Sequence, residues 1–239
     1  METRPRPLPF VLVGVFAALL IGGIALSLST APPLSQQQLR NGAAATLSAS
    51  GFALVDTNSV APLPSATAAS GSVETVVFHV LYTAPDAVEE SEAGAGGAIM
   101  SIILIGDRRF QGSGSQWTAL PPSRGAGAGA VGTILSPLQA AASATKVTRH
   151  GDLYGFVPTS SDRLLTEVLG VRPSQLSSPR LTAVVRAGSL TRETITATYR
   201  HERLTVDLVF SRIGSAPPVT APPSSSLVPQ PGSSTPTAP

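Results

Sequence analysis

The stretch from Phe10 to Leu28 constrains this chain most, because its nineteen residues include no charged side chain and only one hydroxyl group. Such a run is long enough to cross a bilayer as a helix, which needs about 20 mostly apolar residues. On its N-terminal side two arginines outweigh one acid, and positive flanks stay in the cytoplasm. The pattern therefore predicts a cytoplasmic segment over residues 1–9, a transmembrane helix or signal anchor over 10–29, and an extracytoplasmic location for the rest.

A cleaved secretory signal is the alternative for the same run. Its apolar core is usually about 7–15 residues long and is followed by small residues at the cleavage site. Here the run is longer, and the small residues Ser27, Ser29 and Ala31 lead directly into Pro32-Pro33, a poor context for cleavage. We therefore favour an uncleaved anchor in the plasma membrane, with one crossing. If residues 1–30 are cleaved, the protein is secreted.

Composition excludes several classes of protein. The chain has 239 residues, a formal net charge of +2 and 13% charged residues, a balance too weak to indicate nucleic-acid binding. It contains no cysteine, so an exported domain must be stabilised by core packing without disulfides, and no lipid can be attached to a thiol.

The domain boundaries follow shifts in composition. Residues 30–34 form a short proline-bearing stalk, and residues 35–214 are long enough for one sizeable domain. Residues 215–239 are rich in Pro, Ser, Thr and Ala and carry no charge, so they are predicted to form a disordered tail.

Alternating and apolar segments predict about seven antiparallel strands, joined by hairpins, with two or three short helices. The helices do not alternate with the strands, so the pattern indicates an α+β domain and not a doubly wound parallel sheet. Nine segments are candidates for these strands, within residues 52–57, 74–82, 98–105, 108–112, 146–150, 153–157, 180–187, 191–199 and 204–211. The helices are expected from residue 36, over 133–144 and over 164–169.

One glycine-rich motif resembles a cofactor signature. Gly127-Ala-Gly129-Ala-Val-Gly132 matches G-x-G-x-x-G and precedes a predicted helix. A dinucleotide site also needs a strand that leads straight into the loop, whereas the lead-in here is Pro121-Pro-Ser-Arg. We interpret the motif as part of a glycine–alanine loop over residues 121–132, without a cofactor.

The remaining polar residues predict neither a metal site nor an enzyme. His79, His150 and His201 lie on separate strands or turns and lack the close spacing that assembles a metal site. The acidic run over residues 89–92 lacks the alternating ligand pattern of a calcium loop and is interpreted as a solvated loop. No G-x-S-x-G motif exposes a nucleophilic serine.

Excess apolar residues are more informative. Residues 98–105 are apolar on both faces of their strand, and Val77 and Leu81 interrupt the polar face of the strand before it. Two arrangements fit this pattern: a sheet covered by helices on one face and partly buried on the other, or a concave sheet closed by helices around an apolar cavity. The second is a common design for a lipid site, and the residues alone leave both open.

Five short motifs follow one another in a characteristic order along the domain. They are Tyr82-Thr-Ala-Pro-Asp86, Ile105-Gly-Asp-Arg-Arg-Phe110, Trp117, Asp152-Leu-Tyr-Gly-Phe156 and Val209-Phe-Ser-Arg-Ile-Gly214. Their order resembles the LolA-like superfamily of exported lipid and lipoprotein carriers, nearest the LppX/LprG type. The resemblance covers residues 34–223.

The resemblance implies a strongly curved antiparallel sheet, an incomplete barrel, with short helices packed on its concave face. It also implies a hydrophobic cavity between sheet and helices that takes up acyl chains, without covalent chemistry or a cofactor. LppX/LprG members begin with a lipidated cysteine, which this chain lacks, so the helix predicted over residues 10–28 would replace that anchor. The proline-rich tail also lies outside the family pattern.

We therefore expect a membrane-tethered, extracytoplasmic carrier or chaperone for envelope lipids or lipoproteins that bear acyl chains. The alternative is an envelope sensor or scaffold of the same fold that binds a protein partner through a sheet edge or the acidic loop. The residues expected to line the lipid cavity are Phe78, Val80, Tyr82, Ile103, Ile105, Phe110, Trp117, Ile134, Leu135 and Leu138.

Overall fold

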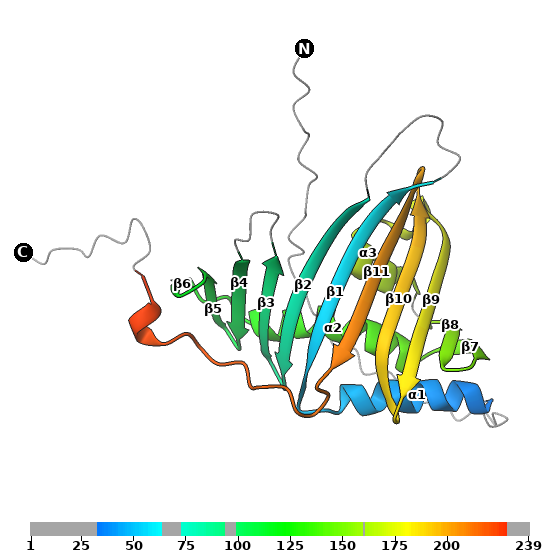
Figure 1. Cartoon of the computed structure of the whole chain (residues 1–239), viewed down its shortest axis with the longest axis horizontal. Coiled ribbons are helices and arrows are strands. Elements are labelled where there is room, and N and C mark those ends of the chain that lie inside the picture. Colours follow the sequence, from blue (N-terminus) through cyan, green and yellow to red (C-terminus); the bar gives the residue numbers. More distant parts are fainter. Residues whose placement is uncertain (1–32, 64–72, 94–98, 160, 229–239) are drawn as a thin grey trace, which may run out of the picture.

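Eleven antiparallel strands form one continuous, curved sheet that does not close into a barrel (Figure 1). The structure is a computed structural model, and it describes residues 33–63, 73–93, 99–159 and 161–228. The strand order is β6-β5-β4-β3-β2-β1-β11-β10-β9-β8-β7, so two runs of neighbouring hairpins meet where β1 pairs with β11. Three helices pack on one face of the sheet, which we call the inner face.

The elements follow one another in a simple order. The first half of the chain contains α1 (Leu34–Leu47), β1 (Gly51–Pro62), β2 (Glu74–Thr83), β3 (Ala87–Ala93), β4 (Ile99–Ile105), β5 (Arg108–Ser113) and β6 (Gln116–Leu120). The second half contains α2 (Ala126–Ala142), β7 (Thr145–His150), β8 (Leu153–Val157), α3 (Ser161–Leu169), β9 (Leu176–Arg186), β10 (Ser189–Tyr199) and β11 (Glu202–Ser211). Short 3-10 turns lie at Pro173–Gln175 (η1) and Ser224–Ser226 (η2).

The predicted antiparallel α+β architecture is confirmed, but the sheet has more strands than the seven or so that we expected. The acidic run expected to be a loop is β3, which pairs with β2 and β4. Its glutamates concealed the strand because an acidic, glycine-flanked composition is typical of loops. Within β3, Val88, Glu90 and Glu92 occupy the inner face, while Glu89 and Ser91 occupy the outer face.

The main core lies on the inner face because alternate residues of each strand point towards the helices. On β1, Phe52 is fully buried, and its ring contacts those of Tyr82 on β2 and Phe210 on β11, with centroids 4.9 and 5.3 Å apart. Leu39 of α1 and Leu138 of α2 are also fully buried in this core. Sheet and helices therefore share one hydrophobic layer.

Polar contacts fix α1 in place over the sheet. The buried hydroxyl of Thr46 accepts the backbone N–H of Leu190 at the start of β10 and lies 3.1 to 3.2 Å from the carbonyl oxygens of Leu190 and Gly42. Near the middle of the helix, the Arg40 guanidinium donates two hydrogen bonds to the carbonyl of Ala144, which follows α2. These bonds tie α1 both to the β9–β10 hairpin and to the end of α2.

The outer face of β2 to β6 is covered by residues 212–228, which we call the C-terminal segment. Figure 1 shows it, in orange and red, running from β11 towards the β6 edge. Val219 is 7% exposed and packs with a second hydrophobic cluster that contains Ile103 and Phe110. Its backbone N–H donates to the hydroxyl of Thr83 at 2.9 Å.

The far end of this segment attaches to the edge of the sheet. Leu227 forms a parallel bridge with Trp117, and the N–H of Val228 donates to the Trp117 carbonyl at 2.7 Å. The prediction of a disordered tail over residues 215–239 is therefore wrong for residues 215–228, and residues 229–239 lie outside the described part of the chain. The outer face of β4 and β5 is apolar, and the valine, alanine and leucine of the segment cover it.

The predicted anchor over residues 10–29 and most of the stalk over 30–34 also lie outside the described residues. Among the helices that the structure describes, none has the length and apolar character needed to cross a membrane.

The glycine-rich motif lies in the first turns of α2, so the loop expected over residues 121–132 ends earlier than predicted. The Asp107 carboxylate accepts the N–H of Gly125 at 2.6 Å, just before the helix begins. The N–H of Gly127 donates to the carbonyl of Gly106 at 2.8 Å, and a methyl group at residue 127 would overlap the carbonyl oxygen of Asp86. Glycine is needed there because α2 approaches the β4–β5 turn and the carbonyl of Asp86 closely.

Replacing Gly127 with alanine should lower the free energy of unfolding by about 1–3 kcal/mol, because the added methyl group forces α2 away from the β4–β5 turn. Gly132→Ala on the same helix is the matched control. No atom lies within 4 Å of the added carbon, so removal of a helical glycine should stabilise by about 0.5–1 kcal/mol. Urea unfolding followed by circular dichroism measures both, and equal midpoints would contradict the close approach.

Replacing Val219 with aspartate should release the C-terminal segment from the sheet, since a charged group cannot occupy this apolar contact without losing its hydration. Hydrogen exchange measured by mass spectrometry should show faster exchange over residues 215–228. Thr220→Asp, at the exposed neighbouring position, should leave the exchange unchanged. If Val219→Asp keeps the protection of the parent protein, the segment is held by other contacts.

Candidate functional site

A cavity of about 170 Å³ lies between the inner face of the sheet and helices α2 and α3. Strands β1, β2, β3 and β11 form its floor. Its apolar lining residues are Leu54, Phe78, Val80, Ile134, Pro137, Val168 and Leu208. Its polar lining residues are Asp56, Asn58, Glu90, Thr133 and Glu167.

The alternation of β1 determines the floor of this cavity. Leu54 and Asp56 follow Phe52 on the inner face, and Leu54 pairs with Val80 while Asp56 pairs with Phe78. On the other side of β1, Asp56 pairs with Leu208. The strand therefore places one carboxylate in an otherwise apolar row.

The size of the cavity limits what it accepts in this conformation. An engineered protein cavity of about 150 Å³ accepts a ligand as large as benzene. A cavity of 170 Å³ therefore takes one end of a single aliphatic chain. A lipid with complete acyl chains requires α2 and α3 to move away from the sheet.

The structure places the residues expected to line a cavity in three groups. Phe78, Val80 and Ile134 line the cavity described above. Tyr82 and Leu138 are buried elsewhere in the main core, and Leu135 packs against that core. The remaining four lie on the outer face or pack against the C-terminal segment there: Ile103, Ile105, Phe110 and Trp117.

The separation of this last group follows from the strand pairing. Ile103 pairs with Glu89 on β3 and with Phe110 on β5, and all three lie on the outer face. Strand β4 is apolar on both faces, so its alternation did not indicate which isoleucines point inwards. Only the register with β3 decides this, and β3 was expected to be a loop.

Two carboxylates of the cavity are destabilised in their charged form. Burial raises the pKa of Asp56 from 3.8 to about 6, although the Asn58 side chain donates a hydrogen bond to it at 3.1 Å. The negative charges of Glu90 and Asp207 raise that pKa further. Burial, and then the charge of Glu92, raise the pKa of Glu90.

A further carboxylate lies deeper under the helices. Glu193 of β10 has no exposed surface, and neither of its carboxylate oxygens has a hydrogen-bond partner. It occupies the inner face between Leu208, a cavity-lining residue of β11, and Ala183 of β9. Burial raises its pKa well above the usual range of a glutamate. An unpaired, fully buried carboxyl group is rare enough in proteins to indicate a functional site.

Sequence reasoning did not single out these acidic residues, although a signal for two of them was present. Asp56 continues the inward alternation of Phe52 and Leu54, and Glu193 alternates in the same phase as Ile195. A charged residue in the apolar phase of a strand indicates a buried carboxylate. Glu90 gave no such signal because β3 was not predicted.

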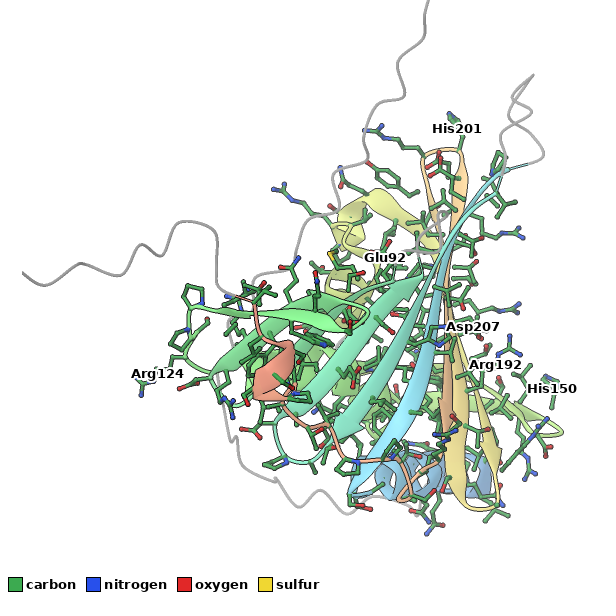
Figure 2. All side chains as sticks on the ribbon, turned by 60° about the vertical axis from the view of Figure 1, so that its left-hand side comes forward. Glu92, Arg124, His150, Arg192, His201 and Asp207 are labelled. Atoms are coloured by element: carbon green, nitrogen blue, oxygen red, sulfur yellow. The ribbon has the colours of Figure 1, made fainter. Side chains whose placement is uncertain are left out.

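The histidines do not form a site. His150 lies on the β7–β8 hairpin and His201 on the β10–β11 hairpin, at separate ends of the molecule (Figure 2). His79 lies on the outer face of β2 and is exposed. Within the described ranges, no three side chains of His, Asp or Glu come together as metal ligands.

A second hollow, of about 200 Å³, lies on the outer face of β1, β2 and β3. Its borders include Val55, His79, Leu81, Glu89 and Ser91, and all of its lining residues belong to the sheet. No described helix covers it, so it cannot enclose a chain between two layers. The cavity on the inner face is therefore the candidate site.

Comparison with solved structures finds one that shares this fold and two that are less similar. Lipoprotein LppX of Mycobacterium tuberculosis is similar to this chain with a TM-score of 0.51 and 14% identity, over 79% of this chain and 99% of LppX. LprF from Mycobacterium bovis is similar over 80% of this chain and 97% of its own, with 14% identity and a TM-score of 0.47. A LolA superfamily protein from Nitrosomonas europaea covers 74% of this chain and 92% of its own, with 10% identity and a TM-score of 0.32.

No family model and no curated protein sequence matches the chain. The likeness to LppX nevertheless confirms the fold that the sequence resemblance predicted. At 14% identity it shows the fold alone.

Replacing Asp56 with asparagine should stabilise the protein at high pH and have little effect at low pH. The folded state keeps the Asp56 proton up to about pH 6, whereas the unfolded chain releases it near pH 4, so ionisation costs stability as the pH rises through this window. The gain for Asp56→Asn should be about 1–2 kcal/mol at pH 8 and near zero at pH 4. Urea midpoints at the two pH values measure it.

Asp207→Asn is the contrasting variant on the outer face. The Asp207 carboxylate accepts two hydrogen bonds from Arg192, at 2.7 and 2.8 Å, and one from Thr194. Removing its charge should therefore lower the free energy of unfolding at pH 8, and with it the urea midpoint. The expected loss is about 0.2–1 kcal/mol because the Arg192 side chain is more than half exposed. Stabilisation by both variants would show a general charge effect and not a property of the cavity.

Proposed function

We propose that this protein binds the acyl chain of an envelope lipid or lipoprotein and acts as a carrier or chaperone for it without covalent chemistry. The observation that carries the proposal is the cavity between the curved sheet and helices α2 and α3. Burial of each methylene group there contributes about 0.8 kcal/mol, so affinity depends on chain length more than on chain identity.

Membrane tethering is part of the proposal. It is supported by the nineteen uncharged residues of the Phe10–Leu28 run and by the two arginines before it. Five residues separate this run from Leu34, where α1 begins, and an extended chain spans at most about 3.6 Å per residue. The domain would therefore work within about 20 Å of the membrane.

The small volume of the cavity supports a second candidate function. If α2 and α3 do not move, a space of 170 Å³ is too small for a complete lipid. The same fold would then act as an envelope sensor or scaffold that binds a protein partner. Whether a complete chain enters the cavity distinguishes the two functions.

The test uses the full chain in nanodiscs of a neutral phospholipid and a twelve-carbon alcohol with a photoreactive diazirine at the end of its chain. After illumination, peptide mapping should locate cross-links on β2 and α2, around Phe78, Val80 and Ile134. Ile134→Trp fills the cavity and should reduce these cross-links by about tenfold, the loss expected when some two methylene groups lose their burial.

Gln139→Trp adds the same side chain to an exposed position of α2 and should leave the cross-links unchanged. Cross-links confined to residues 10–28, with none on β2 or α2, would contradict lipid binding in the cavity and favour the scaffold function.

A further inference from the structure

We infer that the cavity selects a cationic amphiphile, a ligand in which an aliphatic chain ends in an ammonium group that binds between Asp56 and Glu90. This inference rests on the proposed function, because it names the ligand chemistry of the same cavity. Its basis is that β1 and β3, the two strands on either side of β2, each contribute one carboxylate to a space with mostly apolar walls.

The register of the strands shows how the carboxylates are arranged around the apolar floor. Asp56 pairs with Phe78 on β2, and Glu90 pairs with Val80 on the same strand. The two acidic residues therefore flank β2 from opposite sides, offset by one inward position. An aliphatic chain lying over Phe78 and Val80 would keep its polar end within reach of both.

The residues that the structure describes provide no cation to balance the charges of Asp56 and Glu90. None of the twelve residues that line the cavity is basic, and no described arginine, lysine or histidine pairs with Asp56 or Glu90. The described ion pair between Arg192 and Asp207 lies on the outer face, as Figure 2 shows. Buried carboxylates are normally paired, so the missing partner is expected to come from a ligand.

Glu193 is an independent indication that a polar group is missing. Its carboxyl group is fully buried under the helices and has no hydrogen-bond partner, although it shares a cross-strand row with Leu208 and Asp56. Because Leu208 lines the cavity, this row continues the cavity floor towards β10. An unsatisfied carboxyl group is therefore found beyond the lining itself, in the same row of the sheet.

Other ligand classes fit less well. A fatty acid would bring a third carboxylate beside Asp56 and Glu90, and like charges at short range repel. A fatty alcohol would cover Asp56 and Glu90 without neutralising them. An ammonium group donates charge-assisted hydrogen bonds, which are about twice as strong as neutral ones.

The experiment compares three twelve-carbon photoreactive probes that differ only in the head group: a primary amine, an alcohol and a carboxylate. Each is incorporated at equal density into neutral-lipid nanodiscs that hold the full chain, at about pH 7.5, where the amine is protonated and free carboxylic acids are ionised. Cross-linking to β2 and α2 should be about tenfold higher for the amine than for the alcohol, the ratio expected from one charge-assisted hydrogen bond. The carboxylate should cross-link least.

Two neutralising variants locate the selectivity. Asp56→Asn and Glu90→Gln should each reduce the preference for the amine over the alcohol by threefold or more, while the yield with the alcohol stays the same or rises. Glu89→Gln is the matched control, because Glu89 is the neighbouring residue of β3 but points to the outer face. It should retain the full preference.

The outcomes separate this inference from the proposed function. Equal cross-linking of amine and alcohol in the cavity would overturn the inference and leave lipid binding intact. Absence of cavity cross-links with all three probes would overturn the proposed function itself. If butylamine competes with the amine probe as strongly as dodecylamine does, the site recognises the amino group alone. That result would overturn the inference that the ligand is an amphiphile.

Discussion

Covering the inner face of the sheet is the constraint on which the rest of the structure depends. A curved sheet that does not close must bury its apolar concave face under another layer. Helices α1 and α2 supply that layer, and where they contact the sheet the side chains of Leu39, Leu138 and Ile195 are fully buried. Over β1, β2 and β3 the cover from α2 and α3 is incomplete, and this is where the cavity lies. The cavity is thus a property of the fold's layer arrangement and needs no special loop.

The acidic residues of the inner face conflict with that packing. Asp56, Glu90 and Glu193 occupy positions that alternation assigns to apolar side chains, and each loses hydration there. Large aliphatic residues at these positions would stabilise the domain. Natural proteins depart from local rules of this kind mainly at functional sites, where stability is lower than the fold permits. Asp56 and Glu90 therefore coincide with the proposed binding site on the inner face.

Sequence reasoning was most successful where one physical signal dominated. The alternation of β2 and β11 and the turn residues of the hairpins were enough to predict an antiparallel α+β domain, and a motif order predicted the fold that it shares with LppX. Prediction was wrong where two signals competed. Glutamates concealed β3, glycines concealed the first turns of α2, and prolines concealed the ordered contacts of the C-terminal segment. In each case tertiary contacts outweighed local composition. Val219, for example, packs on an apolar surface that several strands form together, so the sequence of any one strand does not predict the contact.

The seam between β1 and β11 has a consequence for how the chain is made. Ala53 and Ser211 lie side by side in the sheet although 158 positions separate them along the chain. The two halves of the sheet cannot join until the last strand has been synthesised, so β1 remains an unpaired edge while nearly all the rest of the domain emerges. Pairing between such distant segments is slow, and open edges of this kind promote aggregation. The nascent chain is therefore most exposed to aggregation just before its final strand appears.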